Sequence, residues 1–214
     1  MRLACHALAL LAVAAALGCG SPASRPRNPA LEDAQANLQA VEARLRAGGA
    51  PTHADYLELG TARYLVWHIY LERSRYPAHT GRARREAAAN RRNAERLEPE
   101  MIDALRRAAD GPADPRVGTG ARVRLASVYG EKRHWDQQIA VLRQILRDDA
   151  DASGPRWFGI GRTPQYYCYY TLAGAYKAKG ERHCAIDALA RALLALDASQ
   201  KAGANVGDRP RRVL

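Results

Sequence analysis

The chain has 214 residues and a formal net charge of +11, and 47% of its residues are hydrophobic. This length suits roughly one domain with a core of its own, and a composition rich in Ala and Leu but poor in aromatic residues favours helices over strands. Arginine supplies nearly all of the positive charge. Because the codon bias of a GC-rich genome also enriches arginine, the charge alone does not indicate nucleic-acid binding.

The first eighteen residues have the pattern of a secretory signal. Arg2 precedes an apolar run from Leu8 to Leu17. This run is too short to cross a membrane, which takes about 20 apolar residues. One positive charge, a short apolar core and small residues are instead typical of a cleaved signal. We therefore exclude residues 1–18 from the expected fold.

The signal ends in Ala16-Leu17-Gly18-Cys19, which resembles the lipobox of bacterial lipoproteins. In that family a small residue precedes a Cys that receives a diacylglyceryl thioether, so the resemblance implies lipidation of Cys19 and a membrane anchor. Ala16 and Leu17 stand in the reverse of the family's favoured order. The alternative is an ordinary secreted protein that is cleaved after a small residue. Gly20 after the Cys implies, by the same resemblance, an outer-membrane location facing the periplasm.

Residues 19–30 comprise the expected lipidated Cys and a segment rich in Pro, Ser and Gly. This segment has no apolar periodicity and buries too little to fold, so we interpret it as a flexible tether.

Helical periodicity begins at residue 31 and continues through most of the chain. The first apolar stripe consists of Leu31, Ala34, Leu38, Val41 and Leu45. Gly48 and Gly49 are expected to end this helix. Thr52 is expected to cap the next helix, with Asp55 in its first turn, and that helix should end before Pro77.

A third helix is predicted over 82–97, and Pro99 suits the first turn of a fourth helix that ends at Gly111. The third helix carries the densest basic run, which consists of Arg82, Arg84, Arg85, Arg91, Arg92 and Arg96. A solvated face is one interpretation of this run, and contact with an anionic envelope surface is another. Nucleic-acid binding is a third interpretation of this run. Export of the protein argues against it, so we expect no nucleic-acid partner.

Two clearer helix pairs follow, one over about 117–130 and 134–148 and the other over about 164–179 and 181–196. The polar tail 198–214 is expected to be disordered. No stretch alternates apolar and polar residues long enough to predict a strand, so the fold class is all-α, either a bundle or a helical solenoid.

The last pair resembles a tetratricopeptide repeat, in which small residues lie at the helix crossing, a Tyr fills the gap and a Gly makes the turn. The residues in this register are Leu172, Ala173, Tyr176, Gly180, Ala185, Leu189 and Ala192. Asp197 stands where the family has a closing Pro. The resemblance implies antiparallel helix pairs, stacked as a short right-handed solenoid over residues 31–197.

The preceding pair resembles a degenerate copy of the same unit. The matching residues are Leu125, Ala126, Tyr129, Trp135, Ile139 and Leu142. Arg133 stands in place of the turn Gly, and Gln138 stands in place of the crossing Ala. Tyr129 and Tyr176 are 47 residues apart, so an insertion of about 13 residues separates the two copies, given the usual repeat of about 34.

In this family the first helix of each pair lines a concave surface that binds a protein or peptide. In the last pair, Tyr167, Tyr170, Gly174 and Lys177 recur at three- and four-residue steps on that helix. Tyr offers rigid apolar area with a polar tip, and Lys177 could receive a carboxylate. Alternatively, the tyrosines simply pack against the neighbouring repeat.

The insertion over 151–164 places Trp157 and Phe158 in a loop rich in Gly and Pro. Such aromatic side chains either dock onto the core or form a partner contact at the rim of the concave surface.

Cysteine and histidine spacing gives no catalytic or metal site. Cys168 and Cys184 are expected about 10 Å apart along the axis of the last pair, too far for a disulfide. The chain has no GxSxG, HExxH, Cys-x-x-Cys or phosphate-binding Gly loop. We therefore predict that the protein is not an enzyme and binds no metal or cofactor.

These observations favour a lipoprotein that acts as a protein- or peptide-binding scaffold in a bacterial cell-envelope complex, as the tetratricopeptide resemblance implies. An open polar groove would favour this function. A closed apolar cavity would favour a small-molecule-binding accessory lipoprotein of a transport system. A buried His or carboxylate with a strongly shifted pKa would favour an envelope enzyme. The sequence predicts neither the partner nor the oligomeric state.

Overall fold

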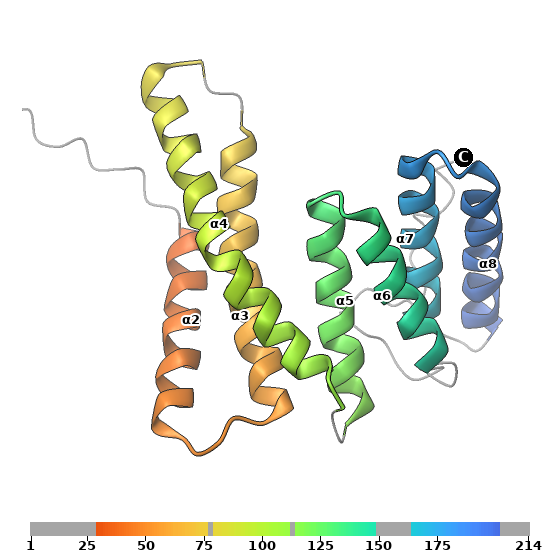
Figure 1. The fold of residues 1–214 in the computed structure, drawn as a ribbon, viewed down its shortest axis with the longest axis horizontal. Helices are drawn as coiled ribbons and strands as arrows, with labels where there is room; N and C mark the ends of the chain where they lie inside the picture. Colours follow the sequence, from red (N-terminus) through yellow and green to blue (C-terminus); the bar gives the residue numbers. More distant parts are fainter. Residues whose placement is uncertain (1–28, 77–78, 112–113, 149–163, 202–214) are drawn as a thin grey trace, which may run out of the picture.

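The computed structural model describes residues 29–76, 79–111, 114–148 and 164–201. All of the regular secondary structure in these residues is helical, which confirms the predicted all-α class (Figure 1). The helices are α2 (Pro29–Ala47), α3 (His53–Arg75), α4 (Gly81–Ala109), α5 (Pro115–Glu131), α6 (Trp135–Asp148), α7 (Pro164–Lys179) and α8 (Arg182–Lys201). The expected signal, Cys19, and the insertion with Trp157 and Phe158 lie outside the described residues.

Helices that follow one another in the chain also pack against one another, from α2 on α3 to α7 on α8. α3 additionally contacts α5, although α4 stands between them in the chain. The molecule is therefore extended along the order of its helices, with α2 and α8 at opposite ends (Figure 1).

The start of α3 has the cap that the sequence predicts. The Thr52 hydroxyl accepts a hydrogen bond from the Asp55 backbone N–H at 3.2 Å, and the Asp55 carboxylate accepts one from the Thr52 N–H at 2.9 Å. This reciprocal pair is a capping box, which satisfies two of the backbone donors that a helix start leaves free. These bonds to Thr52 lower the pKa of the Asp55 carboxyl below its usual value. α3 ends at Arg75, before Pro77 as expected.

The prediction of two separate helices, one ending before Pro99 and one beginning there, is wrong, because α4 is a single helix of 29 residues with this proline inside it. A proline within a helix lacks the N–H that would bond to the carbonyl four residues earlier, which weakens and bends the helix. α4 changes direction along its length (Figure 1). Burial holds it together: Met101 and Leu105 are fully buried, and Gly60 of α3 admits Leu105, which a Cβ there would meet at 2.6 Å.

Two hydrophobic clusters form the main core, and α5 contributes to both. The cluster toward α3 and α4 contains Trp67, Met101, Leu105, Leu125, Val128 and Tyr129. The cluster toward α6, α7 and α8 contains Val123, Ala126, Ile139, Leu142, Ile145, Cys168, Leu172 and Tyr176. α5 is thus buried on two sides, which links the front half of the molecule to the rear half.

The turns of the last two pairs have the same backbone conformation. Gly180 is left-handed with φ 79°, as the sequence predicts, and Arg133 at the equivalent position is left-handed too, with φ 58°. In both turns the next residue donates its N–H to a tyrosine carbonyl, His134 to Tyr129 at 2.8 Å and Glu181 to Tyr176 at 2.9 Å. These are the bonds of a Schellman motif, so the turn survives the loss of its glycine.

The end of the helical body lies later than expected. α8 continues to Lys201, so residues 198–201 of the predicted disordered tail are helical. The rest of that tail lies outside the described residues.

Candidate functional site

Side chains of α3, α5 and α7 meet on one face of the molecule. The Arg124 guanidinium of α5 lies 5.4 Å from the ring centroid of Tyr64 on α3. One turn away on α5, the Ser127 hydroxyl and the Tyr167 hydroxyl of α7 are 3.2 Å apart and share a hydrogen bond. Helices α3, α5 and α7 are therefore joined by polar and aromatic contacts. We call this set, with His68 beside Tyr64, the first-helix face.

The first-helix face has a partly buried aromatic base. His68 stacks on Tyr64 with ring centroids 5.7 Å apart. Burial raises the pKa of the Tyr64 phenol above its usual value, and the nearby positive charge of Arg124 acts in the opposite direction. The phenol therefore stays protonated over the physiological range and keeps a hydrogen-bond donor. The Nδ1 atom of His68 is buried and has no hydrogen-bond partner among the described residues.

The predicted binding residues of α7 are exposed to different degrees. Tyr167 is half-buried and bonded to Ser127. Tyr170 is 38% exposed, and its ring stacks on Tyr166 with centroids 5.8 Å apart. Gly174 and Lys177 are exposed. The structure thus connects Tyr167 to the neighbouring helix and leaves Tyr170 and Lys177 accessible, while Trp157 and Phe158 lie outside the described residues.

Sequence reasoning missed the contributions of α3 and α5 to this face. Ser127 could have been found, because it stands 47 residues before Gly174 in the repeat register. Leu59, Gly60 and Tyr64 hint only weakly at an earlier copy of the repeat. His68 and Arg124 carry no such signal, because contacts between helices depend on the packing angle.

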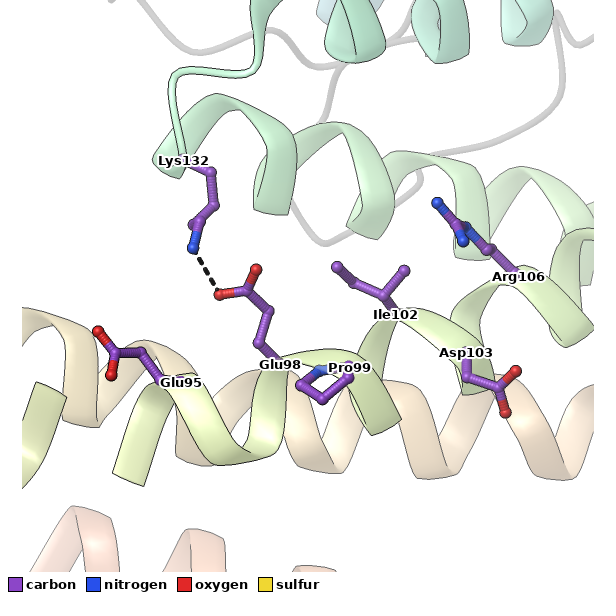
Figure 2. Close-up of a pocket in the computed structure, with 7 residues that line it drawn as sticks. All are labelled: Glu95, Glu98, Pro99, Ile102, Asp103, Arg106 and Lys132. Carbon is purple, nitrogen blue, oxygen red and sulfur yellow. Dashed lines mark hydrogen bonds and ion pairs between the residues drawn. The ribbon is translucent and has the colours of Figure 1, made fainter. Parts of the chain in front are cut away.

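A cleft of about 460 Å³ lies between α4 and the end of α5 (Figure 2). Its lining residues are Glu95, Glu98, Pro99, Ile102, Asp103, Arg106 and Lys132. Lys132 and Glu98 reach toward each other across it and form an ion pair of 2.8 Å (Figure 2). Arg106 donates to the Tyr129 hydroxyl at 3.1 Å. Lys132 and Glu98 thus compensate each other and Arg106 bonds Tyr129, so we interpret the cleft as a polar seam between two packed helices.

A second cleft lies at the turn between α5 and α6, and a third lies among α6, α7 and α8. Lys179 lines the cleft at the turn and binds two carboxylates, Asp136 at 2.6 Å and Glu181 at 2.7 Å. Both raise the pKa of the Lys179 ammonium above its usual value. This lysine therefore joins the end of α7 to the start of α6, and the two carboxylates compensate its charge.

The described residues contain no cluster of three or more His, Cys, Asp or Glu side chains placed to hold a metal ion. Cys168 is buried and Cys184 is exposed, and neither of these two described cysteines forms a disulfide. In the same part of the chain, no helix has the length and apolar character needed to cross a membrane.

No protein-family model, curated protein or solved structure matches this chain. Its function is therefore inferred from its own residues and their geometry.

Proposed function

We propose that the chain is a membrane-anchored lipoprotein that binds a protein or peptide of the bacterial cell envelope on its first-helix face. The observation that supports this most is the contact of α3, α5 and α7 through Arg124 over Tyr64 and Ser127 with Tyr167. A peptide that crosses these helices would meet aromatic rings, hydroxyl groups and the exposed side chain of Lys177. Tyrosine and arginine are the residue types enriched where protein interfaces gain most of their energy.

The proposed architecture is a short right-handed stack of antiparallel helix pairs of the tetratricopeptide type. Two features support it. Helices adjacent in the chain are adjacent in space, as in repeat proteins whose units contact only their neighbours. The last two pairs also share one turn conformation at positions 47 residues apart, Arg133 and Gly180. In such a stack the first helices line the concave side.

The scaffold function fits the clefts better than the small-molecule alternative does. The clefts between α4 and α5 and at the α5–α6 turn are lined by charged side chains that already pair within the protein, whereas a small apolar ligand needs an apolar cavity.

The proposed anchor is a lipid on Cys19, which would hold the body at the outer membrane on its periplasmic side. α2 begins at Pro29, ten residues after Cys19. Ten extended residues span at most roughly 35 Å, so the helices would stay near the membrane surface. Intact-mass measurement of the full chain, produced in a bacterial envelope, should find a diacylglyceryl addition that the Cys19→Ala variant lacks. If Cys19 is unmodified, the proposed lipid anchor is excluded and the alternative of an ordinary secreted protein remains.

Affinity capture from an envelope extract tests the first-helix face. The full chain in mild detergent should retain a partner that the Tyr167→Ala/Tyr170→Ala double variant loses. Tyr76→Ala is the matched control, since Tyr76 is 70% exposed at the end of α3 and outside this face. Circular dichroism establishes that each variant is folded, and the purified partner should then bind the wild-type chain directly. Capture that the double variant leaves unchanged would exclude the first-helix face as the binding surface.

A further inference from the structure

The cleft among α6, α7 and α8, which we call the rear cleft, differs from the others in its chemistry. It encloses about 420 Å³. Its lining residues are Arg143, Leu146, Tyr169, Leu172, Tyr176, His183, Cys184, Asp187, Ala188 and Arg191. The apolar part of the lining comes from Leu146, Leu172, Ala188 and the two tyrosine rings. Arginines from α6 and α8 stand on its two sides, so an apolar floor is combined with positive charge.

Arg143 is held in place by a neutral partner. Its Nη2 donates to the Tyr176 hydroxyl at 2.6 Å, and the guanidinium lies 5.7 Å from the centroid of the same ring. No carboxylate pairs with Arg143 among the described residues. A guanidinium has five N–H donors, so most of its donors remain available for a ligand. The bond to Tyr176 fixes the orientation of the guanidinium, but no carboxylate among the described residues compensates its charge.

The opposite wall of the rear cleft is closer to neutral. Arg191 pairs with Asp187 one turn earlier on α8, at 2.9 Å. Asp187 and the Tyr169 hydroxyl both raise the pKa of the Arg191 guanidinium above its usual value. His183 and Cys184 belong to the first turn of α8, where the helix dipole adds partial positive charge. The rear cleft as a whole thus offers about one uncompensated positive charge beside an apolar floor.

We propose that the rear cleft binds a small organic monoanion in which one carboxylate is attached to an apolar or aromatic group. The carboxylate pairs with the Arg143 guanidinium, whose planar fork matches it with two parallel hydrogen bonds. The apolar group covers Leu146, Leu172 and Ala188 between the rings of Tyr169 and Tyr176. A single free charge favours one carboxylate over a multiply charged phosphate.

This site is separate from the proposed partner-binding surface. Neither Tyr167 nor Tyr170 lines the rear cleft. At about 100° per residue, Leu172 and Tyr176 lie about 120° or more around α7 from both of them. The Tyr167→Ala/Tyr170→Ala variant should therefore bind the anion as the wild-type chain does. Failure of one proposal would leave the other standing.

Calorimetric titration of the full chain with 3-phenylpropionate tests the proposal. We expect saturable binding that requires both parts of the probe, so that neither neutral 3-phenylpropionamide, nor acetate, nor inorganic phosphate binds comparably. Alkylation of Cys184, followed by mass spectrometry of the peptide that contains it, should slow when the carboxylate is bound. Equal binding of the neutral amide or of phosphate, absence of binding by 3-phenylpropionate, or unchanged Cys184 alkylation at saturation would overturn the proposal.

Arg143→Ala should weaken binding by about tenfold or more, the usual effect of losing a hydrogen bond to a charged group. Arg147→Ala is the matched control, because Arg147 is exposed one turn further along α6, changes the net charge equally and does not line the rear cleft. Arg143→Lys keeps the charge without the fork and should lie between the two. If Arg143→Ala and Arg147→Ala lose equal affinity, the anion is attracted by the net charge of the protein only. This result would overturn the proposal that Arg143 binds the carboxylate.

Discussion

The helix pairs α5–α6 and α7–α8 make the same turn from different residues. In the second pair Gly180 supplies the left-handed position and Ala185 occupies the helix crossing. In the first pair Arg133 takes the left-handed position, and the larger Gln138 occupies the crossing, where it is buried. The pair that departs further from the repeat pattern therefore keeps its backbone geometry. Compensation must come from elsewhere in that pair.

Gly130 provides the compensation. The Gln138 side-chain amide donates to the Ala126 carbonyl at 3.0 Å, and a Cβ at position 130 would lie 2.4 Å from the Gln138 Nε2 atom. In the second pair Lys177 stands at the position of Gly130, and Ala185 stands at the position of Gln138. The first pair accommodates a buried amide because position 130 has no side chain. Adding a side chain at position 130 alone should therefore break this fit.

The largest difference between the pairs should appear at their equivalent leucines. Leu142 is fully buried between the two pairs, whereas Leu189 of α8 is only partly buried. Leu142→Ala should lower the free energy of unfolding by about 3 kcal/mol, because it leaves a cavity. Leu189→Ala should cost about 1 kcal/mol, since less apolar area is lost. Urea denaturation followed by circular dichroism measures both free energies of unfolding. Equal decreases in the two variants would contradict the deeper burial of Leu142.

A double-mutant cycle tests the fit between Gly130 and Gln138. Gly130→Ala in the wild-type chain should displace the Gln138 amide and cost about 1 kcal/mol of unfolding free energy, even though alanine favours a helix. In the Gln138→Ala background the same change should stabilise the protein by about 1 kcal/mol, because only the helix propensity remains. The measurement is again urea denaturation. If Gly130→Ala has the same effect in both backgrounds, the two residues are not coupled.

The smallest effect is expected at Arg133, the turn residue of the first pair. A non-glycine residue in the left-handed region costs about 1 kcal/mol, so Arg133→Gly should raise the free energy of unfolding by about 0.5 kcal/mol after the entropy of the more flexible unfolded chain is subtracted. Gly180→Ala should lower it by about 1 kcal/mol for the same steric reason. Thermal melts of the two variants should shift in opposite directions, and shifts of the same sign would contradict a shared turn conformation.

The sequence predicted the elements well wherever local chemistry decides them. Apolar periodicity, the Thr52 cap and the Gly180 turn involve residues within one or two turns of each other. Pro99 misled the prediction, because the local rule places a proline at a helix start. Burial of Met101 and Leu105 against α3 instead carried the helix through it.

The first-helix face could be predicted only on α7, where the tyrosines are dense enough in sequence to mark one side of a helix. Arg124 and Tyr64 come together from helices 60 residues apart. Nothing in either local sequence indicates that contact, because it depends on how α3 and α5 cross.

By itself the sequence determined the all-α class, the places where most helices begin and end, and the left-handed turn at Gly180. These features follow from backbone preferences and apolar periodicity, which act over a few residues. Only the tertiary structure decided that α4 is continuous, that Arg133 adopts a glycine's conformation, and that Arg143 lines the rear cleft without a carboxylate partner among the described residues. Such features arise when burial of distant side chains outweighs a local preference of about 1–3 kcal/mol.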